Sequence, residues 1–142
     1  MATTRTANAH WEGSLMDGAG TVSLDSSQTG SFDVTWASRA EQANGRTSPE
    51  ELIAAAHSTC FSMALSHALA GDGHPPQKID TRADVDFQAG KGITGIRLTV
   101  RGKVDGLSED AFVEAAKAAK ENCPVSQALA GTTISLDAAL DG

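Results

Sequence analysis

The longest uninterrupted pattern in the chain is a stretch without formal charge between residues 52 and 70. Apolar or small residues occupy nearly every helical face of this stretch, which predicts a helix surrounded by protein, as the centre of a subunit or of an oligomer. Ser48 can cap the helix, with Pro49 in its first turn and Glu51 in the capping-box position, and Gly71 supplies its end. Serine, threonine and histidine side chains within the stretch favour a buried helix over a membrane span.

Alternating apolar and polar residues after this helix predict an antiparallel hairpin. Residues 79–87 and 96–104 each place apolar side chains on one face and mostly charged ones on the other, and Gly90-Lys91-Gly92 provides a flexible link. Aspartates of the first strand, matched with arginines and a lysine of the second, would help to set the register. The charged face is interpreted as a solvated sheet surface.

Shorter patterns complete the predicted elements. Ser108 can cap a second helix that ends near Asn122, residues 132–137 form a further strand, and the runs 21–24 and 32–36 form edge hairpins. This order predicts an α+β fold, with antiparallel sheets around the long central buried helix. A length of 142 residues suits one core, so residues 1–142 are expected to form a single domain.

Charge and composition narrow the range of partners. With 18 acidic and 11 basic residues the formal net charge is −7, which disfavours binding to nucleic acid or to an anionic membrane. No apolar run follows the first positive charge, so we expect no secretory signal and a cytoplasmic location. Structural disulfides are rare in that compartment, where a cysteine pair is more often catalytic, metal-binding or simply buried.

Cys60 and Cys123 are therefore the candidate chemical residues. On a helix His57 lies one turn before Cys60, within reach of its thiol, and could act as a thiolate-stabilising base. From the spacing alone, an inert buried cysteine and a satisfied core histidine remain open. No Cys-x-x-Cys or His-x-x-x-His spacing supports a metal site, so neither a metal nor another cofactor is expected.

Among the charged residues near the start of the long helix, three are candidates for a role at the thiol: Glu50, Arg39 and Arg46. Capping explains Glu51 but not Glu50, which is either a solvated first-turn carboxylate or a functional one. Either arginine would lower the pKa of a nearby thiol through its positive charge, although loop arginines are mostly solvated.

Three segments of the chain together resemble a known family. They are Ala9 to Gly13, the block from Ser48 to Ser66 that contains Pro-Glu-Glu-Leu and Cys60, and the block from Asn122 to Leu129 that contains Cys123-Pro124. In these segments the chain resembles the osmotically inducible protein C (OsmC) family of bacterial thiol peroxidases, relatives of the organic hydroperoxide resistance (Ohr) proteins. It looks more like the OsmC branch. The matching segments run in order over almost the whole chain.

This resemblance implies roles for four residues. Cys60 would be the peroxidatic cysteine and Cys123 the resolving cysteine, with Arg39 and Glu50 as the pair that supports the Cys60 thiolate; Arg46 is the alternative to Arg39. The implied reaction is reduction of organic hydroperoxides, and more weakly of hydrogen peroxide, in oxidative or osmotic stress defence. A Cys60 sulfenic acid condenses with Cys123, and an external dithiol, lipoyl or thioredoxin-like, reduces the disulfide. No bound cofactor is needed.

The spacing of Glu50 and Cys60 adds a prediction about assembly. Ten residues on a straight helix correspond to about 15 Å of axial rise, too far for one hydrogen-bonded cluster. Either the helix bends or Glu50 serves the Cys60 of a second subunit. The second option agrees with the intertwined dimers typical of the family that the chain resembles, so we expect a homodimer with two sites at the subunit interface.

The neighbours of Cys60 bear on the substrate. Phe61 and Met63 are apolar and would suit the carbon tail of an organic hydroperoxide better than hydrogen peroxide. The alternative to a peroxidase is a redox-sensing or small-ligand-binding module that uses the same thiols without turnover. A purely structural role for both thiols predicts no rapid reaction with peroxide.

Overall fold

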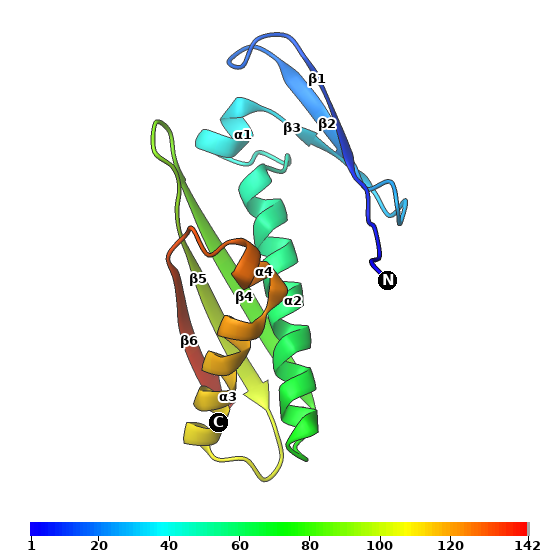
Figure 1. Ribbon diagram of the computed structural model, residues 1–142. Coiled ribbons are helices and arrows are strands. Elements are labelled where there is room, and N and C mark those ends of the chain that lie inside the picture. Colours follow the sequence, from blue (N-terminus) through cyan, green and yellow to red (C-terminus); the bar gives the residue numbers. More distant parts are fainter. Residues whose placement is uncertain (142) are drawn as a thin grey trace. The chain divides into compact units, whose positions relative to one another are not determined.

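The chain forms an α+β fold, described for residues 1–141 by a computed structural model (Figure 1). In chain order the elements are β1 (Asn8–Glu12), β2 (Ala19–Ser23), β3 (Ser31–Val34), α1 (Trp36–Ala40), α2 (Pro49–Gly71), β4 (Lys78–Gln88), β5 (Gly92–Lys103), α3 (Glu109–Asn122), α4 (Pro124–Ala128) and β6 (Ile134–Leu140). The predicted fold class is confirmed. The backbone divides into two compact units, with the boundary after Leu52. A single domain over 1–142 stays a prediction.

The first unit contains a small antiparallel sheet in the order β1-β2-β3. The two predicted edge runs are found as β2 and β3, but the second run ends earlier than expected because Trp36 begins α1. Thr35 caps α1, since its hydroxyl accepts from the Ser38 N–H and the Ser38 hydroxyl accepts from the Thr35 N–H. Both faces of the sheet are largely open, and Trp11 and Phe32 are 41% and 42% exposed.

The long helix α2 has the predicted limits. The Ser48 hydroxyl accepts from the Glu51 N–H at 3.1 Å, as a capping residue should. The Glu51 carboxylate takes a different partner from the one that a capping box predicts, because it accepts from the Thr47 hydroxyl at 2.6 Å. A proline in the first turn and two acidic residues beside it suit the positive end of the helix.

Burial of α2 on all sides was expected, and the single chain does not provide it. His57, Phe61, Leu65 and Leu69 are fully or almost fully buried, and they form one stripe because residues four apart share a helix face. The opposite face is open, with Met63 68% exposed. By length and composition alone α2 is also a candidate membrane span; its buried stripe is what the core helix of a folded domain shows.

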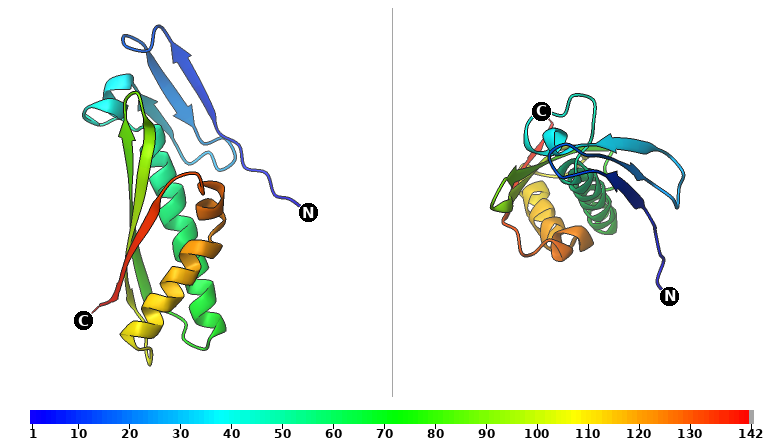
Figure 2. Two further views of the ribbon diagram at one scale, coloured as in Figure 1. Left: turned by 60° about the vertical axis from the view of Figure 1, so that its left-hand side comes forward. Right: turned by 90° about the horizontal axis from the view of Figure 1, so that it is seen from above.

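The second unit contains a sheet in the order β4-β5-β6, with α2 and α3 on the same side of it (Figure 2). The predicted hairpin is confirmed as the antiparallel pair β4–β5. The last strand differs from the expectation of antiparallel sheets, because β6 runs parallel to β5. The crossover through α3 and α4 explains this, since a helical connection returns the chain in the same direction.

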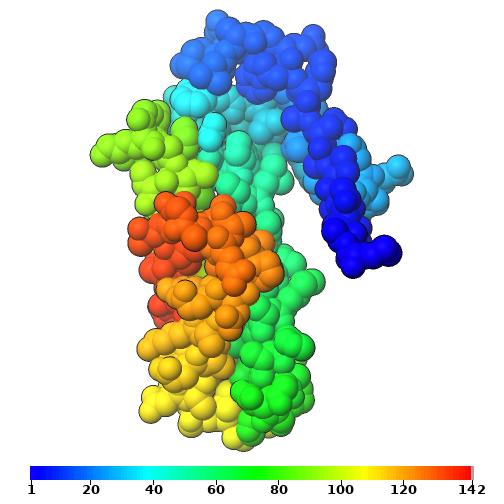
Figure 3. Space-filling view, viewed as in Figure 1, coloured from blue at the N-terminus to red at the C-terminus, as the bar shows by residue number. Residues whose placement is uncertain are grey.

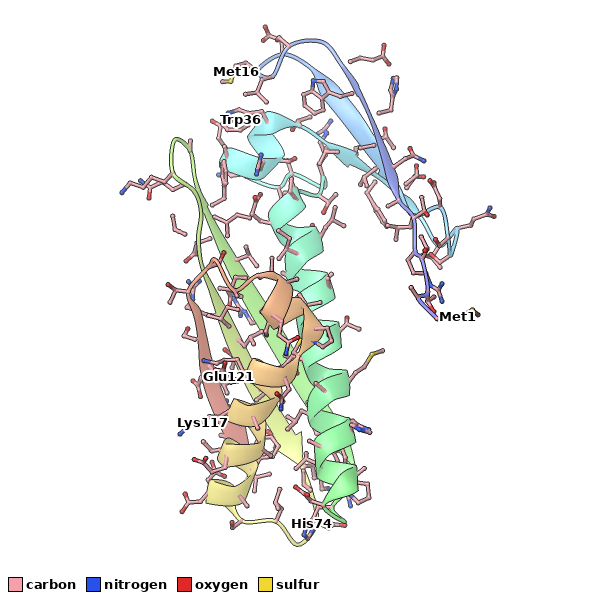
Figure 4. The ribbon with its side chains drawn as sticks, viewed as in Figure 1. Met1, Met16, Trp36, His74, Lys117 and Glu121 are labelled. Carbon is pink, nitrogen blue, oxygen red and sulfur yellow. The ribbon has the colours of Figure 1, made fainter. Side chains whose placement is uncertain are left out.

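The core of the second unit lies between this sheet and the two helices. Phe61, Leu65 and Leu69 of α2 meet Leu98 and Val100 of β5, and the buried stripe of α3 completes the cluster. α3 and β6 lie side by side on one face (Figure 3). Lys117 and Glu121 lie along α3 (Figure 4), and with Leu136 and Ala138 of β6 they line a shallow groove.

Charge pairs cover the outer face of the hairpin, and one of them, Arg97 with Asp86, is a cross-strand match of the predicted kind. Asp84 stands opposite Arg97 in the register, but Arg97 binds Asp86 instead, and Asp84 binds Arg82 of its own strand. These side chains are mostly exposed, and pairs of this kind contribute little to stability. The apolar inner face therefore sets the register.

We predict that Gly102→Ala destabilises the fold. Gly102 of β5 is buried, and a Cβ there would lie 2.7 Å from the ring of Phe112 on α3. Forcing a methyl group into a packed core costs about 1–3 kcal/mol, which urea unfolding would measure. Gly131→Ala is the matched control because nothing lies within 4 Å of its Cβ position. Equal stability of the two variants would contradict the packing described for β5 and α3.

Candidate active site

The position of Cys123 follows from the proline after it. Proline lacks an N–H and cannot continue a helix, so α3 ends at Asn122 and α4 begins at Pro124. Cys123 is the junction residue, with an extended backbone (φ −60°, ψ 122°), and its side chain is completely buried. The break thus turns a cysteine into the core at the start of a new helix.

Cys60 lies on α2 next to the buried stripe and is only partly buried. Its neighbour Phe61 is fully enclosed in the core and lines no open site, whereas Met63 is exposed. Cys60 packs against the core cluster that contains Cys123, and the two thiols, both reduced, interact side chain to side chain. The structure therefore brings the two sequence-predicted cysteines together, one from α2 and the other from the junction of α3 and α4.

The two thiols have different electrostatic surroundings. Burial raises the pKa of Cys60, the backbone N–H of Val125 opposes this, and the Cys123 thiol raises it further. Burial also disfavours the thiolate of Cys123, but the Ser126 N–H, the Cys60 thiol and the Ser126 hydroxyl together lower its pKa. Within one chain the surroundings thus favour the thiolate of Cys123 over that of Cys60.

His57 contacts a serine rather than the thiol of Cys60. Its Nε2 lies 2.7 Å from the Ser126 Oγ, and its Nδ1 has no hydrogen-bond partner among the described residues. His57 is 0% exposed and burial lowers its pKa, so the ring is neutral at physiological pH. The sequence-based role as a base for Cys60 is not supported by these contacts.

Arg39 and Glu50 form a bidentate ion pair within the first unit. Arg39 Nε donates to Glu50 Oε1 at 3.0 Å, and Arg39 Nη2 donates to Glu50 Oε2 at 2.9 Å. The Glu50 side chain is 8% exposed and that of Arg39 31%. Arg46 is exposed and has no ion pair within residues 1–141. Of the two candidate arginines, Arg39 is therefore the one that Glu50 holds.

The short helix α1 fixes the backbone that carries Arg39. The Ser38 hydroxyl lies 2.8 Å from the Thr47 carbonyl oxygen, to which it can donate. The Thr47 N–H donates to the Asp33 carbonyl at 2.9 Å. These bonds tie α1 to the residues just before α2, so the guanidinium meets a carboxylate in the first turn of α2. No sequence signal pointed to Ser38 as an anchor.

The two free thiols, one partly exposed and the other buried, make up the candidate redox site. Side chains that could hold a metal ion in groups of three or more are absent from the described residues. The groove beside α3 does not include either cysteine. The groups that the described residues offer at this site are the two thiols and the hydrogen-bond donors of Val125 and Ser126.

Comparison with known proteins identifies the family. The model of the OsmC-like protein family matches residues 42–137. Peroxiredoxin OsmC of Escherichia coli is 45% identical over 124 residues, which cover 85% of this chain and 86% of that protein, and the protein of the same name from Shigella flexneri matches equally. The chain therefore belongs to the OsmC-like family, and it is a thiol-dependent peroxidase.

Solved structures show the same fold. An organic hydroperoxide resistance protein OsmC from Legionella pneumophila has a TM-score of 0.71 at 21% identity and covers 100% of this chain and 99% of its own. OhrB of Bacillus subtilis has a TM-score of 0.67 at 25% identity, covering 96% and 98%. The resemblance found in the sequence is thus confirmed.

We predict that the buried His57 makes stability depend on pH. Its lowered pKa means that the unfolded chain binds the proton more readily, so stability is complete above the unfolded pKa of about 6.5 and is lost as the pH falls below it. Between pH 7.5 and 5.5 the wild type should lose about 1 kcal/mol more than His57→Gln, measured by urea unfolding. His67→Gln, on the exposed face of α2, should behave as the wild type does; equal losses in all three proteins would refute the prediction.

Proposed function

We propose that the protein reduces organic hydroperoxides, and hydrogen peroxide more weakly, through a sulfenic acid on Cys60 and a Cys60–Cys123 disulfide. The observation that carries this assignment is the pairing of a partly exposed thiol with a fully buried one. A peroxide must reach the sulfur that it oxidises, which favours Cys60 as the peroxidatic residue. The buried Cys123 is protected from direct oxidation and suits the resolving role.

In the first step the Cys60 thiolate attacks the distal oxygen of the hydroperoxide. An S–O bond forms, the O–O bond breaks, and the alkoxide takes up the proton that the thiol had released, which gives an alcohol and a sulfenic acid. In the second step Cys123 forms the disulfide with release of water. An external dithiol, lipoyl or thioredoxin-like, then restores both thiols and is itself oxidised to a disulfide.

The nucleophilic step requires a positive charge near Cys60. Burial raises the pKa of this thiol within one chain, whereas the thiolate is the reactive form. A guanidinium within a few ångströms favours the thiolate. Arg39, held by Glu50 in a bidentate pair, is the cation that we assign to this role.

An obligate homodimer would supply that charge. On one straight helix Glu50 and Cys60 are about 15 Å apart in axial rise, which is too far for a direct cluster. We propose that the Arg39–Glu50 pair of one subunit serves the Cys60 of its partner. The open face of α2 around Met63 and the exposed Trp11 and Phe32 offer apolar surface for such an interface.

The cellular setting belongs to the same proposal. A cytoplasmic location agrees with a reducible thiol pair, because that compartment holds the dithiols needed for turnover. Neither nucleic acid nor a membrane surface is proposed as a partner, since the net charge of −7 disfavours both. Defence against oxidative or osmotic stress is the corresponding role.

We predict that one equivalent of cumene hydroperoxide converts the reduced protein to a Cys60–Cys123 disulfide. Thiol titration and mass spectrometry would follow the reaction. Cys60→Ser should not consume peroxide, whereas Cys123→Ser should consume it and retain a sulfenic acid. Hydrogen peroxide should react more slowly than cumene hydroperoxide. Two persistent free thiols in the wild type would overturn the proposal, and one turnover without reduction by added dithiols would favour a redox sensor.

Mixed dimers test the origin of the Arg39–Glu50 pair. Glu50→Ala and Cys60→Ser should each be inactive, but after subunit exchange one site of every mixed dimer is intact. Random exchange should restore about a quarter of wild-type turnover. A mixture of Cys60→Ser with Cys123→Ser should recover nothing, because both thiols of a site come from one chain. Absence of recovery in verified mixed dimers of the first pair would argue for a site within one subunit.

A further inference from the structure

We propose that Ser126 is a further catalytic residue, which stabilises the Cys123 thiolate as the disulfide forms, and that His57 is the positioning residue that turns the Ser126 hydroxyl toward Cys123. The inference rests on the proposed function and concerns its second step. It assigns a task to two buried polar side chains that the attack on peroxide does not use.

The structure joins two of these residues directly and places the two cysteines beside them. His57 of α2 and Ser126 of α4 are joined through Nε2 and Oγ at 2.7 Å, and they are 0% and 6% exposed. Cys123 stands at the capping position of α4 and Ser126 is the third residue of that helix, the position from which a side chain can reach back to the capping residue. In agreement with this placement, the Ser126 N–H and hydroxyl lower the pKa of Cys123. Cys60 packs against the core cluster that contains Cys123.

The unpartnered Nδ1 of His57 indicates where the protons lie. A neutral imidazole carries one N–H. If the proton were on Nδ1, a buried N–H would have no acceptor, and orphaned buried N–H groups are rarer than unpaired acceptors. With the proton on Nε2, His57 donates to the Ser126 Oγ. The single hydroxyl hydrogen of Ser126 is then free to point at Cys123.

This arrangement matters most when Cys123 becomes charged. In the reduced protein Cys123 makes no side-chain capping bond at the start of α4. Contacts to a reacting group are often long in a resting structure and shorten as charge develops. A preorganised hydroxyl therefore stabilises the thiolate more than the neutral thiol, because a hydrogen bond to a charged group is the stronger one.

The step itself balances. Cys123 loses its proton and its thiolate attacks the sulfenic sulfur of Cys60. The S–S bond forms, the S–O bond breaks, and the departing hydroxide takes up the released proton to give water. Cys123 is oxidised and the sulfur of Cys60 is reduced, with the electron pair of the S–O bond leaving on oxygen.

Other titratable groups around Cys123 are few. From α2, Cys60 packs against the core cluster that contains Cys123, and His57 is bonded to Ser126. From α3, Lys120 and Glu121 line a small pocket that Ser126 also lines, and the Lys120 ammonium is engaged by the Ile134 carbonyl and the Glu121 carboxylate. We therefore assign the pH dependence of the second step to the Cys60 and Cys123 thiols, with the Ser126 hydroxyl as the hydrogen-bond donor to the Cys123 thiolate.

The test separates the two steps by rapid mixing of the reduced, full-length protein with cumene hydroperoxide at pH 6 to 9. Formation of the sulfenic acid depends on peroxide concentration, whereas disulfide formation does not. Ser126→Ala should leave the first rate within about twofold. In this variant the fraction of Cys123 that is a thiolate should fall about tenfold at low pH. Each thiolate should be more nucleophilic because its pKa is higher, so disulfide formation should slow only about threefold. At high pH the variant should equal or exceed the wild type.

Conservative variants complete the design. Ser126→Thr and His57→Gln keep the hydroxyl and the N–H donor and should restore the wild-type profile, whereas His57→Leu should resemble Ser126→Ala. Ser58→Ala is the matched control, because the Ser58 hydroxyl bonds the Ala54 carbonyl of its own helix. Rates of Ser126→Ala that equal the wild type at every pH would overturn the inference. So would an equal slowing at every pH, which indicates a structural role.

A second measurement needs no peroxide. Ultraviolet titration of thiolate absorbance in Cys60→Ser reports Cys123 alone, and adding Ser126→Ala should shift its midpoint upward by about one pH unit. An unchanged midpoint would overturn the inference. A wild type that fails to react with hydroperoxide, while this midpoint still shifts, would instead count against the proposed function and leave the Ser126–Cys123 interaction supported.

Discussion

The break between α3 and α4 at Pro124 is the constraint on which the site depends. In a continuous helix the helical repeat alone would decide which way Cys123 points. The backbone N–H groups that follow it would then form hydrogen bonds within the helix. Because Pro124 forces a restart, Cys123 stands ahead of free N–H groups of a new helix and is fully buried against α2. One covalent feature thus sets the depth, the partners and the electrostatics of the second thiol.

The two units supply different kinds of chemistry. The second unit holds sulfur and neutral donors, and burial there works against a charged Cys60. The first unit holds the bidentate Arg39–Glu50 pair, whose carboxylate is almost completely enclosed. A buried carboxylate needs its cation, and a buried thiolate needs one as well. In the proposed dimer the Arg39 guanidinium would neutralise both the Glu50 carboxylate and the Cys60 thiolate. Assembly and reactivity are therefore linked.

Much of the fold was predictable because its signals are local and strong. Ser48, Pro49 and Gly71 marked the limits of α2, and alternation marked the β4–β5 hairpin. The five-residue helices α1 and α4 were missed, because so few residues leave no periodicity to detect. The parallel pairing of β6 and the one-sided burial of α2 depend on contacts between distant segments. Of the site, the cysteines were evident, but nothing in the sequence singled out Ser126, whose partner His57 is 69 residues away.

The complete burial of Cys123 also decides the direction of recycling. A dithiol reductant meets only the sulfur of Cys60 at the surface, so in the proposed cycle it forms its mixed disulfide there and expels Cys123. A thiol with a lower pKa leaves faster in such an exchange. The donors that lower the pKa of Cys123 therefore assist the same sulfur twice, first as nucleophile and then as leaving group. Loss of one hydroxyl would slow the reopening of the bridge and, at low pH, its closing.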